Sequence, residues 1–358
     1  MSVRYIPVQW NRNKWIYDGV LLAAAFVYIA FFLYLTPALA DHSRPVDAQI
    51  WRARAFGTCA FLMLTVILAI GPLARLDTRF LPLLYNRRHF GVLTFFIALS
   101  HALFVLDWYF AFSRTPKLEA LLGSNTSFGQ LVGFPFEVLG IAALLVLAVM
   151  AFTSHDFWLN FLGPKLWKRL HLLIYPGYLC ATAHLAFGAW IDQGSLGLSL
   201  LLFGGAGTVA VLHALAAVSE RRHATQAIRT DSGGWIDVCP PLEIPDKRGR
   251  IIVLSPDERV AVFRNGDTFA AVANACAHQN GPLGEGKIVG GCITCPWHGF
   301  GYRMEDGRSP PPFTEMIPTY RLRLNDGMLQ VHGSANPPGT YQEPVRLSGT
   351  ASLEGGPA

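Results

Sequence analysis

Long apolar runs, separated by short polar segments, fill the first part of the chain and then stop. A helix needs about 20 apolar residues to cross a bilayer. Six runs approach or reach that length, namely 15–40, 53–74, 89–112, 131–153, 166–190 and 196–218. The first run is too long for a signal-peptide core and has no clear cleavage site, so we expect an uncleaved first span. The pattern predicts an all-α membrane bundle of six helices over residues 1–218.

The pattern changes after this bundle. Residues 219–235 are polar and contain glycine, which is typical of a linker. Short β-type runs follow, and Pro, Asp and Gly residues separate them. These runs are 251–254, 260–263 and 269–272. They predict the strands of a small all-β domain.

A hairpin is expected near the end of that domain. Residues 320–324 alternate between polar and apolar, Asp326 and Gly327 form a turn, and residues 328–332 return along the first strand. We therefore place the all-β domain at 236–333. Residues 334–358 are rich in Gly, Pro, Ser and Thr, and we expect a disordered tail there.

Composition supports a membrane protein with a soluble C-terminal domain. The 358 residues are 52% hydrophobic and only 15% charged, whereas soluble proteins carry about 25% charged residues. The net charge of +5 is explained by basic residues that flank spans, so no nucleic-acid partner is expected. The six cysteines show no disulfide framework, which is consistent with a reducing compartment.

Basic residues predict the orientation of the bundle, because Lys and Arg concentrate in cytoplasmic loops. One set of segments holds most of them: Arg4, Arg12, Lys14, Arg75, Arg79, Arg87, Arg88, Lys165, Lys168, Arg169, Arg221 and Arg222. The opposite set holds Arg44, Arg114 and Lys117, with Arg52 and Arg54 at a span boundary as the main counter-evidence. Both termini, and with them the C-terminal domain, are therefore expected in the cytoplasm.

Two Cys-His pairs form the strongest motif of the chain. Cys276 and His278 are followed, after sixteen residues, by Cys295 and His298. Two thiolates and two imidazoles suit either a tetrahedral zinc ion or a [2Fe–2S] cluster with cysteines on one iron and histidines on the other. Zinc fingers usually pair cysteine with cysteine and histidine with histidine. Each half here mixes the two, which favours the cluster.

Histidines inside the apolar runs are candidate haem ligands, because ionisable residues within spans are costly and usually functional. His101 in the third run and His184 in the fifth are at similar depth, counted from the basic clusters at the cytoplasmic ends. Two imidazoles that face each other across a bundle suit the axial ligation of a b-type haem. The alternative is a pair of hydrogen bonds between helices.

A third histidine indicates a second, inner haem. His171 precedes His184 by thirteen residues, roughly 20 Å along a helix, and Pro176 between them can kink that helix. The partner of His171 remains open between His89 and His213, each of which has a structural alternative. We therefore expect one or two b-type haems.

The membrane half resembles the ferric reductase-like transmembrane family, and within it the haem subunits of bacterial methionine sulfoxide reductases. The matching residues are Arg87, Arg88, Gly91, His101, Thr153, Ser154, Leu162, Gly163, Trp167, Leu170, His171, Tyr175 and His184. This resemblance implies haem ligation by His101, His171 and His184. It also implies a multi-pass protein of the bacterial inner membrane.

The C-terminal half resembles Rieske ferredoxin-type domains over residues 235–333. The resemblance rests on Cys276, His278, Gly281, Pro282, Leu283, Gly284, Cys295, Pro296, Trp297, His298 and Gly299. It implies a [2Fe–2S] cluster held by Cys276 and Cys295 on one iron and by His278 and His298 on the other. The two histidines are expected to be exposed at the tip of the domain.

Two departures separate the motif from quinol-oxidising Rieske subunits. Those subunits brace the loops with a disulfide, where this chain has Gly281 and Trp297, and they place a serine beside the cluster where this chain has Phe300. Tyr302 matches their tyrosine. Fewer hydrogen bonds to the sulfur atoms predict a potential near the low end of the Rieske range, about −150 mV.

Together these features predict a transmembrane electron-transfer protein, an oxidoreductase component of ferric reductase type. No glycine-rich dinucleotide loop follows a strand, so the expected donor is a separate cytoplasmic reductase or ferredoxin. Electrons would pass from the cluster to the haems, and then to a periplasmic reductase, ferric iron or quinone. Two alternatives stay open: reverse flow from quinol or the periplasm to a cytoplasmic oxidase or oxygenase, and a redox sensor.

Overall fold

The computed structural model describes residues 12–39, 46–84, 86–111, 114–224, 233–255, 258–278, 281–296, 299–311 and 313–347. The chain divides into two compact units, one helical and one rich in β-strands, and each is described by itself.

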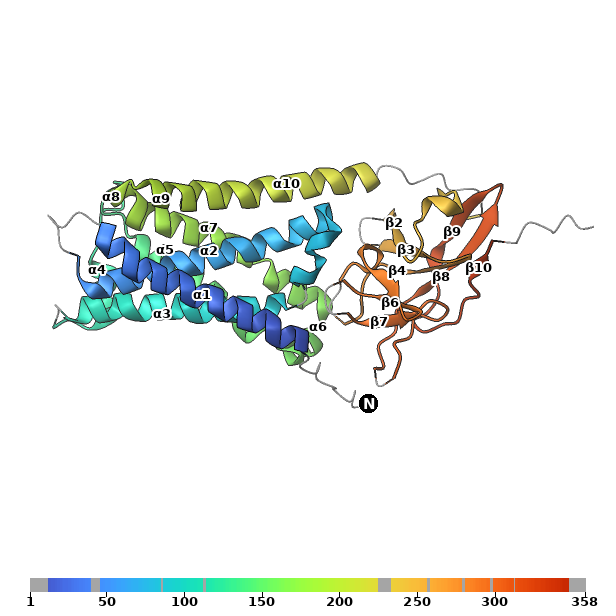
Figure 1. Cartoon of the computed structure of the whole chain (residues 1–358), viewed down its shortest axis with the longest axis horizontal. Helices are drawn as coiled ribbons and strands as arrows, with labels where there is room; N and C mark the ends of the chain where they lie inside the picture. Colours follow the sequence, from blue (N-terminus) through green and yellow to red (C-terminus); the bar gives the residue numbers. More distant parts are fainter. Residues whose placement is uncertain are drawn as a thin grey trace, which may run out of the picture. The chain divides into compact units, whose positions relative to one another are not determined.

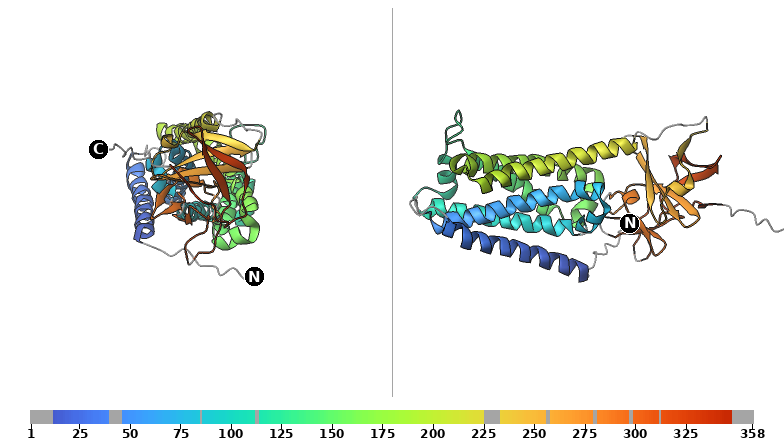
Figure 2. Two further views of the ribbon diagram at one scale, coloured as in Figure 1. Left: turned by 90° about the vertical axis from the view of Figure 1, so that its right-hand side faces the viewer. Right: turned by 45° about the horizontal axis from the view of Figure 1, so that its top comes forward.

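The long helices of the first unit pack side by side in a bundle (Figures 1 and 2). The α-helices are α1 (Arg12–Leu39), α2 (Ala48–Leu76), α3 (Arg87–Ala111), α4 (Lys117–Gly123), α5 (Phe136–Phe152), α6 (Asp156–His171), α7 (Ile174–Leu185), α8 (Ile191–Gln193), α9 (Leu196–Ser199) and α10 (Gly205–Ala224). Two π-turns (η2, Ala186–Trp190; η3, Leu200–Gly204) complete it. A 3₁₀-helix (η1, Thr78–Leu84) lies between α2 and α3 in the sequence and is grouped with the other unit.

Five segments of the described helices are long and apolar enough to cross a membrane. They are Lys14–Ala38, Ala48–Leu76, Arg87–Trp108, Leu166–Trp190 and Leu196–Val218. The sixth expected span coincides with α5, an apolar helix of 17 residues, which is shorter than the other five. The span count from the structure is therefore five, with one shorter apolar helix.

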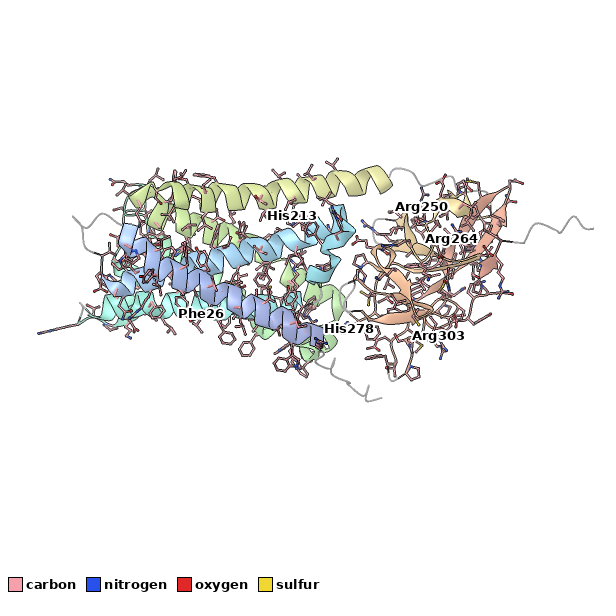
Figure 3. All side chains as sticks on the ribbon, viewed as in Figure 1. Phe26, His213, Arg250, Arg264, His278 and Arg303 are labelled. Carbon is pink, nitrogen blue, oxygen red and sulfur yellow. The ribbon has the colours of Figure 1, made fainter. Side chains whose placement is uncertain are left out.

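Helix α2 supplies much of the packed interior of this unit. Its Phe61, Leu64 and Leu68 are buried in one cluster with Tyr178 of α7 and with residues of α5 and α10. Helix α1 presents large apolar side chains outward instead, such as Phe26, which is 73% exposed (Figure 3). Apolar side chains on the outer surface and a packed helix in the interior are what a lipid environment favours.

The fifth expected span is interrupted, as the sequence predicts from Pro176. Helix α6 ends at His171 and α7 begins at Ile174. Proline lacks an N–H group and its ring clashes with the carbonyl four residues earlier, which here belongs to Leu172. The two redox-candidate histidines of this span, His171 and His184, therefore lie on two helices rather than one. The π-turn η2 begins two residues after His184.

The second unit contains a large antiparallel sheet and a small one. The strands are β1 (Trp235–Cys239), β2 (Gly249–Ser255), β3 (Glu258–Asn265), β4 (Thr268–Ala273), β5 (Lys287–Val289), β6 (Cys292–Thr294), β7 (Gly301–Arg303), β8 (Thr319–Asn325), β9 (Met328–Ala335) and β10 (Val345–Arg346), with 3₁₀-helices η4 (Pro241–Glu243) and η5 (Leu283–Glu285). The large sheet has the order β1-β9-β8-β4-β3-β2, with β10 paired to β4, and the small sheet has the order β5-β6-β7.

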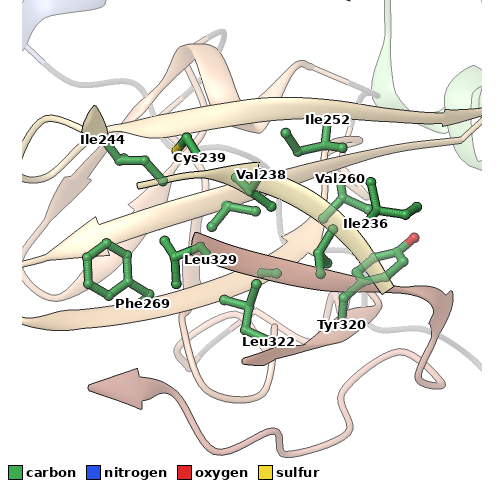
Figure 4. Packing of buried hydrophobic residues seen from close by; sticks show 13 residues of the cluster. Ile236, Val238, Cys239, Ile244, Ile252, Val260, Phe269, Tyr320, Leu322 and Leu329 are labelled. Carbon is green, nitrogen blue, oxygen red and sulfur yellow. The ribbon is translucent and has the colours of Figure 1, made fainter. Parts of the chain in front are cut away.

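Strands β3 and β4 are buried on both faces. Successive side chains of a strand point to opposite faces, so Val260 and Val262 enter one core while Ala261 and Phe263 enter the other. Figure 4 shows the first core, where Val260 packs with residues from the other strands of the large sheet. The second core lies between β3, β4 and the small sheet, and it includes Cys276 and Cys295. The cluster loops therefore rest on a packed hydrophobic layer.

The hairpin expected at residues 320–332 is confirmed. Asn325 pairs with Met328, and the two residues between them, Asp326 and Gly327, have φ values of 48° and 76°. Positive φ at both central positions is the type I′ geometry that suits a two-residue hairpin. The expected strands at 251–254, 260–263 and 269–272 lie within β2, β3 and β4.

The disordered tail expected from residue 334 is wrong for residues 334–347. Strand β9 continues to Ala335, and Val345 of β10 pairs with Phe269 of β4. Backbone bonds hold the intervening segment, including Asn336 N–H to the Thr319 carbonyl at 2.8 Å. The composition of this segment favoured disorder. Composition does not reveal that the segment can pair with backbone groups of β4, which is far away in the sequence. The expected linker is also shorter, because α10 extends to Ala224 and β1 begins at Trp235; residues 225–232 lie outside the described ones.

Candidate redox sites

Two loops carry the Cys-His pairs of the β-rich unit. The first, which joins β4 to β5, carries Cys276 and His278, and the second, which joins β6 to β7, carries Cys295. The N–H of Cys276 donates to the Gly281 carbonyl at 2.9 Å, and the N–H of Cys295 donates to the Phe300 carbonyl at 2.8 Å. Each loop thus folds back on itself around its cysteine. His298 and Trp297 lie outside the described residues.

Both cysteines point into the protein. Cys276 and Cys295 are each 2% exposed, and no disulfide links any of the cysteines in the described part of the chain. A thiolate buried in apolar surroundings is stabilised by a metal ion. The donor types, two buried sulfur atoms and the imidazole of His278 on the same loop as Cys276, are therefore consistent with an iron–sulfur cluster. Among the described residues, no group of three or more His, Cys, Asp or Glu side chains is arranged so that it could hold a metal ion.

Tyr302 supplies a hydrogen bond to one of these sulfur atoms. Its hydroxyl lies 3.3 Å from the Sγ of Cys276, and its side chain is completely buried. Burial, and then the charge of Cys276 beside it, raises the pKa of Tyr302 far above its usual value. The hydroxyl therefore stays protonated and donates to the sulfur atom. Such a bond favours the reduced, more negative cluster.

Phe300 occupies the place where the quinol-oxidising proteins have serine, and its ring covers His278. The two rings are stacked, with centroids 5.0 Å apart and planes 10° apart. The ring of Phe313 packs against that of Phe300, with centroids 4.7 Å apart, and Phe313 is 36% exposed. Phe300 therefore supplies no hydrogen-bond donor at this position, and its apolar ring packs against the imidazole of His278.

In the helical unit, the structure brings His101 of α3 and His184 of α7 together. Their ring centroids lie 6.1 Å apart, with planes inclined by 75°. A metal–imidazole bond is about 2 Å long, so one iron between the two ε nitrogens requires ring centres roughly 6 Å apart. The spacing of the pair therefore fits axial ligation of one haem iron.

Backbone carbonyls orient both rings. The Nδ1 of His101 lies 2.7 Å from the Ala53 carbonyl, and the Nδ1 of His184 lies 2.9 Å from the Phe136 carbonyl. Because a carbonyl oxygen only accepts, each Nδ1 carries the proton, and the lone pair stays on Nε2. A fixed tautomer of this kind is the usual arrangement of metal-binding histidines.

Two glycines make room for these rings. A Cβ atom at Gly57 would lie 2.8 Å from His101, and one at Gly140 would lie 2.7 Å from His184. Any side chain at either position would displace the imidazole. Sequence reasoning missed Gly57, Gly140 and the two carbonyls, because only the three-dimensional packing shows which small residue faces which ring.

His171 has the same tautomer in a different setting. Its Nδ1 donates to the Trp167 carbonyl at 3.0 Å, and the Trp167 ring stacks on it with centroids 3.7 Å apart. Its Nε2 is buried and has no hydrogen-bond partner among the described residues. An unpartnered buried nitrogen costs free energy, and coordination of a metal would remove that cost. His171 therefore fits a haem ligand.

The two candidate partners of His171 make other contacts. The Nδ1 of His89 lies 2.7 Å from the Asp18 carboxylate of α1. The Nδ1 of His213 donates to the Val209 carbonyl at 2.8 Å, and its Nε2 lies 3.1 Å from the Tyr175 hydroxyl. Both nitrogens of His213 are thus occupied. None of these three contacts involves His171.

Comparisons with known proteins identify both halves of the chain. Residues 55–182 match the family described as "Ferric reductase like transmembrane component", and residues 234–321 match the "Rieske [2Fe-2S] domain". The ferredoxin subunit of anthranilate 1,2-dioxygenase from Burkholderia cepacia is 35% identical over 74 residues, which are 20% of this chain and 68% of that protein.

Two further known proteins each resemble only one part of the chain. The haem-binding subunit MsrQ of protein-methionine-sulfoxide reductase from Xanthomonas campestris pv. campestris is 36% identical over 131 residues, 36% of this chain and 53% of that protein. The chain thus spans about half the length of this relative. A solved complex of reduced oxygenase and oxidised ferredoxin in carbazole 1,9a-dioxygenase matches with 26% identity and a TM-score of 0.28, covering 30% of this chain and 99% of the matched one.

Fold and sites together define a multi-pass membrane protein of the electron-transfer class, with a haem-binding helical domain and a Rieske [2Fe–2S] domain. The chain belongs to the proteins that join a ferric reductase like transmembrane component to a Rieske [2Fe-2S] domain.

Proposed function

We propose that the chain carries electrons across a membrane, from a cytoplasmic donor through the Rieske cluster and two b-type haems to an acceptor on the other side. The observation that carries this proposal is the pair formed by His101 and His184, whose rings lie 6.1 Å apart. Two oriented imidazoles in the interior of a membrane bundle would hold a haem, which would supply one-electron transfer chemistry there.

Each chain residue has a defined task in this proposal. Cys276, Cys295, His278 and His298 hold the cluster, with Tyr302 donating to the Cys276 sulfur atom. His101 and His184 hold the outer haem. The bound cluster and haems supply one-electron redox chemistry. The Ala53 and Phe136 carbonyls hold the protons of the two imidazoles at Nδ1 and so keep each Nε2 directed at the metal position.

His171 is proposed to hold the inner haem. Its Nδ1 is fixed by the Trp167 carbonyl, and its Nε2 is buried. His171 and His184 are thirteen residues apart in the sequence, and each helical residue adds 1.5 Å. Two haems at these depths divide the apolar core into two shorter steps for the electron.

The topology of the proposal has six spans, with α5 as the fourth. Its 17 residues reach the short end of the range for a transmembrane helix, about 17–25 residues. With six spans, the basic segments lie on one side. Both termini and the Rieske domain, with boundaries near residues 236 and 333, are then cytoplasmic in a bacterial inner membrane.

The partners follow from what the chain lacks and from its sites. A cytoplasmic reductase or ferredoxin would be the donor, since the sequence has no dinucleotide-binding loop. The acceptor would be a periplasmic reductase, ferric iron or a quinone. The name of the Xanthomonas relative, a haem-binding subunit of protein-methionine-sulfoxide reductase, supports a reductase of methionine sulfoxide as the acceptor.

A cofactor count on the purified full-length protein tests this function. We expect two haems by pyridine haemochrome and two cluster irons per chain. His101→Ala and His184→Ala should each remove the same haem, whereas His155→Ala, at the start of α6, should remove none. A haem content unchanged by His101→Ala would overturn the pairing.

Reverse flow is the second candidate. The Burkholderia relative is the ferredoxin subunit of a dioxygenase, and in such a role the Rieske domain would pass electrons to a cytoplasmic oxygenase. Quinol or a periplasmic donor would then reduce the haems first. Reduction of the haems by a quinol analogue, followed by reduction of the cluster, would favour this direction.

A further inference from the structure

The small sheet of the Rieske domain has one face turned to solvent. Its buried side chains, Ile288, Ile293 and Tyr302, enter the core that contains Cys276 and Cys295. Successive side chains of a strand point to opposite faces, so the residues between these three form an outer face. They are Lys287, Val289, Cys292, Thr294, Gly301 and Arg303. The outer face and the core that contains the two cysteines are thus the two sides of one sheet.

One row of paired residues crosses this face and leads to the loop of a cluster cysteine. Lys287 pairs with Thr294, and Arg248, just before β2, forms a β-bridge with Lys287 on the other side. Residues directly opposite each other on paired strands have side chains on the same face, with Cβ atoms about 5 Å apart. Thr294 immediately precedes Cys295. The two cations of this row therefore lie beside the loop that carries Cys295.

A third cation borders the same row. Lys247 precedes Arg248 and is exposed, and its φ of 59° is the left-handed conformation that few residues other than glycine adopt. The carbonyl of Lys247 accepts a hydrogen bond from the N–H of Ile288 at 3.0 Å, which fixes the backbone of Lys247 against β5. Lys247, Arg248 and Lys287 are called the basic patch below.

The charge of the basic patch is available to a partner. Among the described residues, none of its three side chains forms a salt bridge. Two carboxylates are near it in the sequence, those of Asp246 and Glu285, and that of Asp246 accepts the N–H of Gly266 at 2.7 Å. Positive charge is therefore in excess at the patch. Other arginines of the domain are paired, namely Arg250 with Glu243 and Arg303 with Asp306.

We propose that the basic patch is the docking surface for the electron donor, and that this donor is a protein with an acidic surface around its own redox group. The inference rests on the proposed function, in which a separate protein reduces the Rieske site. Complementary charges steer the encounter of two proteins and raise their association rate. After docking, one electron passes from the reduced donor to the oxidised Rieske site, and no bond is formed or broken.

The position of the patch favours a redox protein over lipid headgroups as its occupant. Gly286, next to Lys287, packs against the Cys295 loop, since a Cβ atom there would lie 3.3 Å from the Cδ of Pro296. A donor held at the patch is thus brought close to the iron ligands. A membrane surface bound at the same place would cover the Cys295 loop and keep a donor away from it.

Reduced plant-type ferredoxin, a small acidic protein with a potential of about −400 mV, is the probe for this surface. The full-length protein would be held in nanodiscs of phosphatidylcholine, which has no net charge. Growth of the Rieske EPR signal after rapid freezing would give the rate constant. This rate constant should fall with added salt, because salt screens exposed charges. Lys287→Glu and Arg248→Glu should each lower it about tenfold at low salt, and less at high salt.

Arg346→Glu is the matched control for charge reversal. Arg346 is exposed and pairs with Thr268, at the end of β4 that is remote from Cys276. The rate constant of this variant should equal that of the wild type. Reduction by the neutral lumiflavin radical should be equally fast in all four proteins, which shows that the cluster is intact and accessible. Equal rates with ferredoxin in all four proteins would overturn the docking surface.

Two further outcomes separate the possible occupants and the two proposals. If Lys287→Glu and Arg248→Glu differed from the wild type only in nanodiscs that contain phosphatidylglycerol, the patch would bind anionic lipid and the donor surface would be overturned. If the ferredoxin reduced the cluster with the expected dependence on charge while the haems stayed oxidised, the docking surface would stand and the proposed path through the haems would fail.

Discussion

At the scale of single residues, the same hydrogen bond recurs at His101, His171 and His184. Each Nδ1 donates to a backbone carbonyl, of Ala53, Phe136 or Trp167. The carbonyls of Ala53 and Phe136 are 48 residues from their histidines in sequence, whereas that of Trp167 is only four residues away. The outer pair is therefore oriented by tertiary packing, and His171 is oriented by its own helix.

The glycines opposite the outer pair should be essential for haem binding. Gly57→Ala and Gly140→Ala place a methyl group within 3 Å of His101 and His184 respectively, and the ring must rotate away. We expect the bis-histidine low-spin signal of each variant to fall by at least about half, because an iron–nitrogen bond tolerates little displacement.

Gly207→Ala is the matched control for these two variants. Gly207 lies within α10, and a Cβ atom added there would meet no atom within 4 Å apart from the adjacent backbone of its own helix. Alanine is also the better helix former by about 1 kcal/mol. Haem spectra of this variant should equal those of the wild type. Equal haem loss in all three variants would show a general packing defect instead of a specific contact.

Tyr302→Phe should lower the potential of the Rieske cluster. The substitution removes the hydroxyl that lies 3.3 Å from the Cys276 sulfur atom, and with it a bond that stabilises the reduced cluster. A net contribution of about 0.5–1.5 kcal/mol corresponds to roughly 20–60 mV for a one-electron couple. Redox titration of the cluster signal would measure the shift.

Tyr320→Phe provides the comparison for that shift. Tyr320 is also buried, but its hydroxyl donates to the Glu258 carboxylate at 2.9 Å and belongs to the other core. Its loss should lower stability and leave the potential unchanged. A similar potential in Tyr302→Phe and the wild type would show that the hydroxyl does not tune the cluster.

At the scale of elements, the motif loops depend on close contacts between strands. A Cβ atom at Gly286 would lie 2.1 Å from the Thr294 carbonyl oxygen, so the chain between η5 and β5 passes directly over β6. The turn between β5 and β6 uses Gly290 and Gly291, with φ values of 57° and 79°. These glycines allow the small sheet to fold tightly beneath both cysteines.

Removal of the segment after Gly333 should destabilise the Rieske domain. Removal of a disordered tail would have no such effect. The truncation loses the end of β9, the pairing of β10 with Phe269, and the bond from Leu347 N–H to the Asp267 carbonyl. Several bonds of about 1 kcal/mol each should lower the melting temperature by about 10 °C.

Cluster bleaching on heating, followed by visible circular dichroism, checks this. A truncation after Leu347 keeps β10 and serves as the control, with an expected melting temperature equal to that of the full chain. If the shorter chain bleached at the same temperature as both others, β10 would contribute nothing to the stability of the cluster domain.

Local patterns predicted the elements whose signal lies in consecutive residues. The strands at 251–254, 260–263 and 269–272 and the hairpin at Asp326–Gly327 are such cases. Strand β10 was missed because two residues carry too little pattern, and its pairing partner lies more than seventy residues earlier. The meeting of His101 with His184 was predicted from depth, but the carbonyls and glycines that orient them depend on packing between helices.

At the scale of the whole molecule, two features beside the cluster ligands bear on the reduction potential of the Rieske cluster. Phe300 replaces a possible donor with an apolar ring over His278, and Tyr302 retains one donor to Cys276. One hydrogen-bond donor to the cluster in place of two favours a reduction potential in the lower part of the Rieske range, which extends from about −150 to +300 mV. A low potential makes the cluster a better donor than acceptor.

Potentiometric titration of the full-length protein should therefore place the cluster below the haem of His101 and His184. For a one-electron couple, each 59 mV or so changes the equilibrium tenfold, so a cluster about 100 mV lower reduces that haem almost completely. The cluster would be followed by its low-temperature EPR signal and the haems by their α-bands. His278→Ala should remove the EPR signal and leave both α-bands, which assigns the signal to the Rieske site. A cluster about 100 mV above both haems would make outward flow untenable and would favour delivery of electrons from the haems to a cytoplasmic oxygenase.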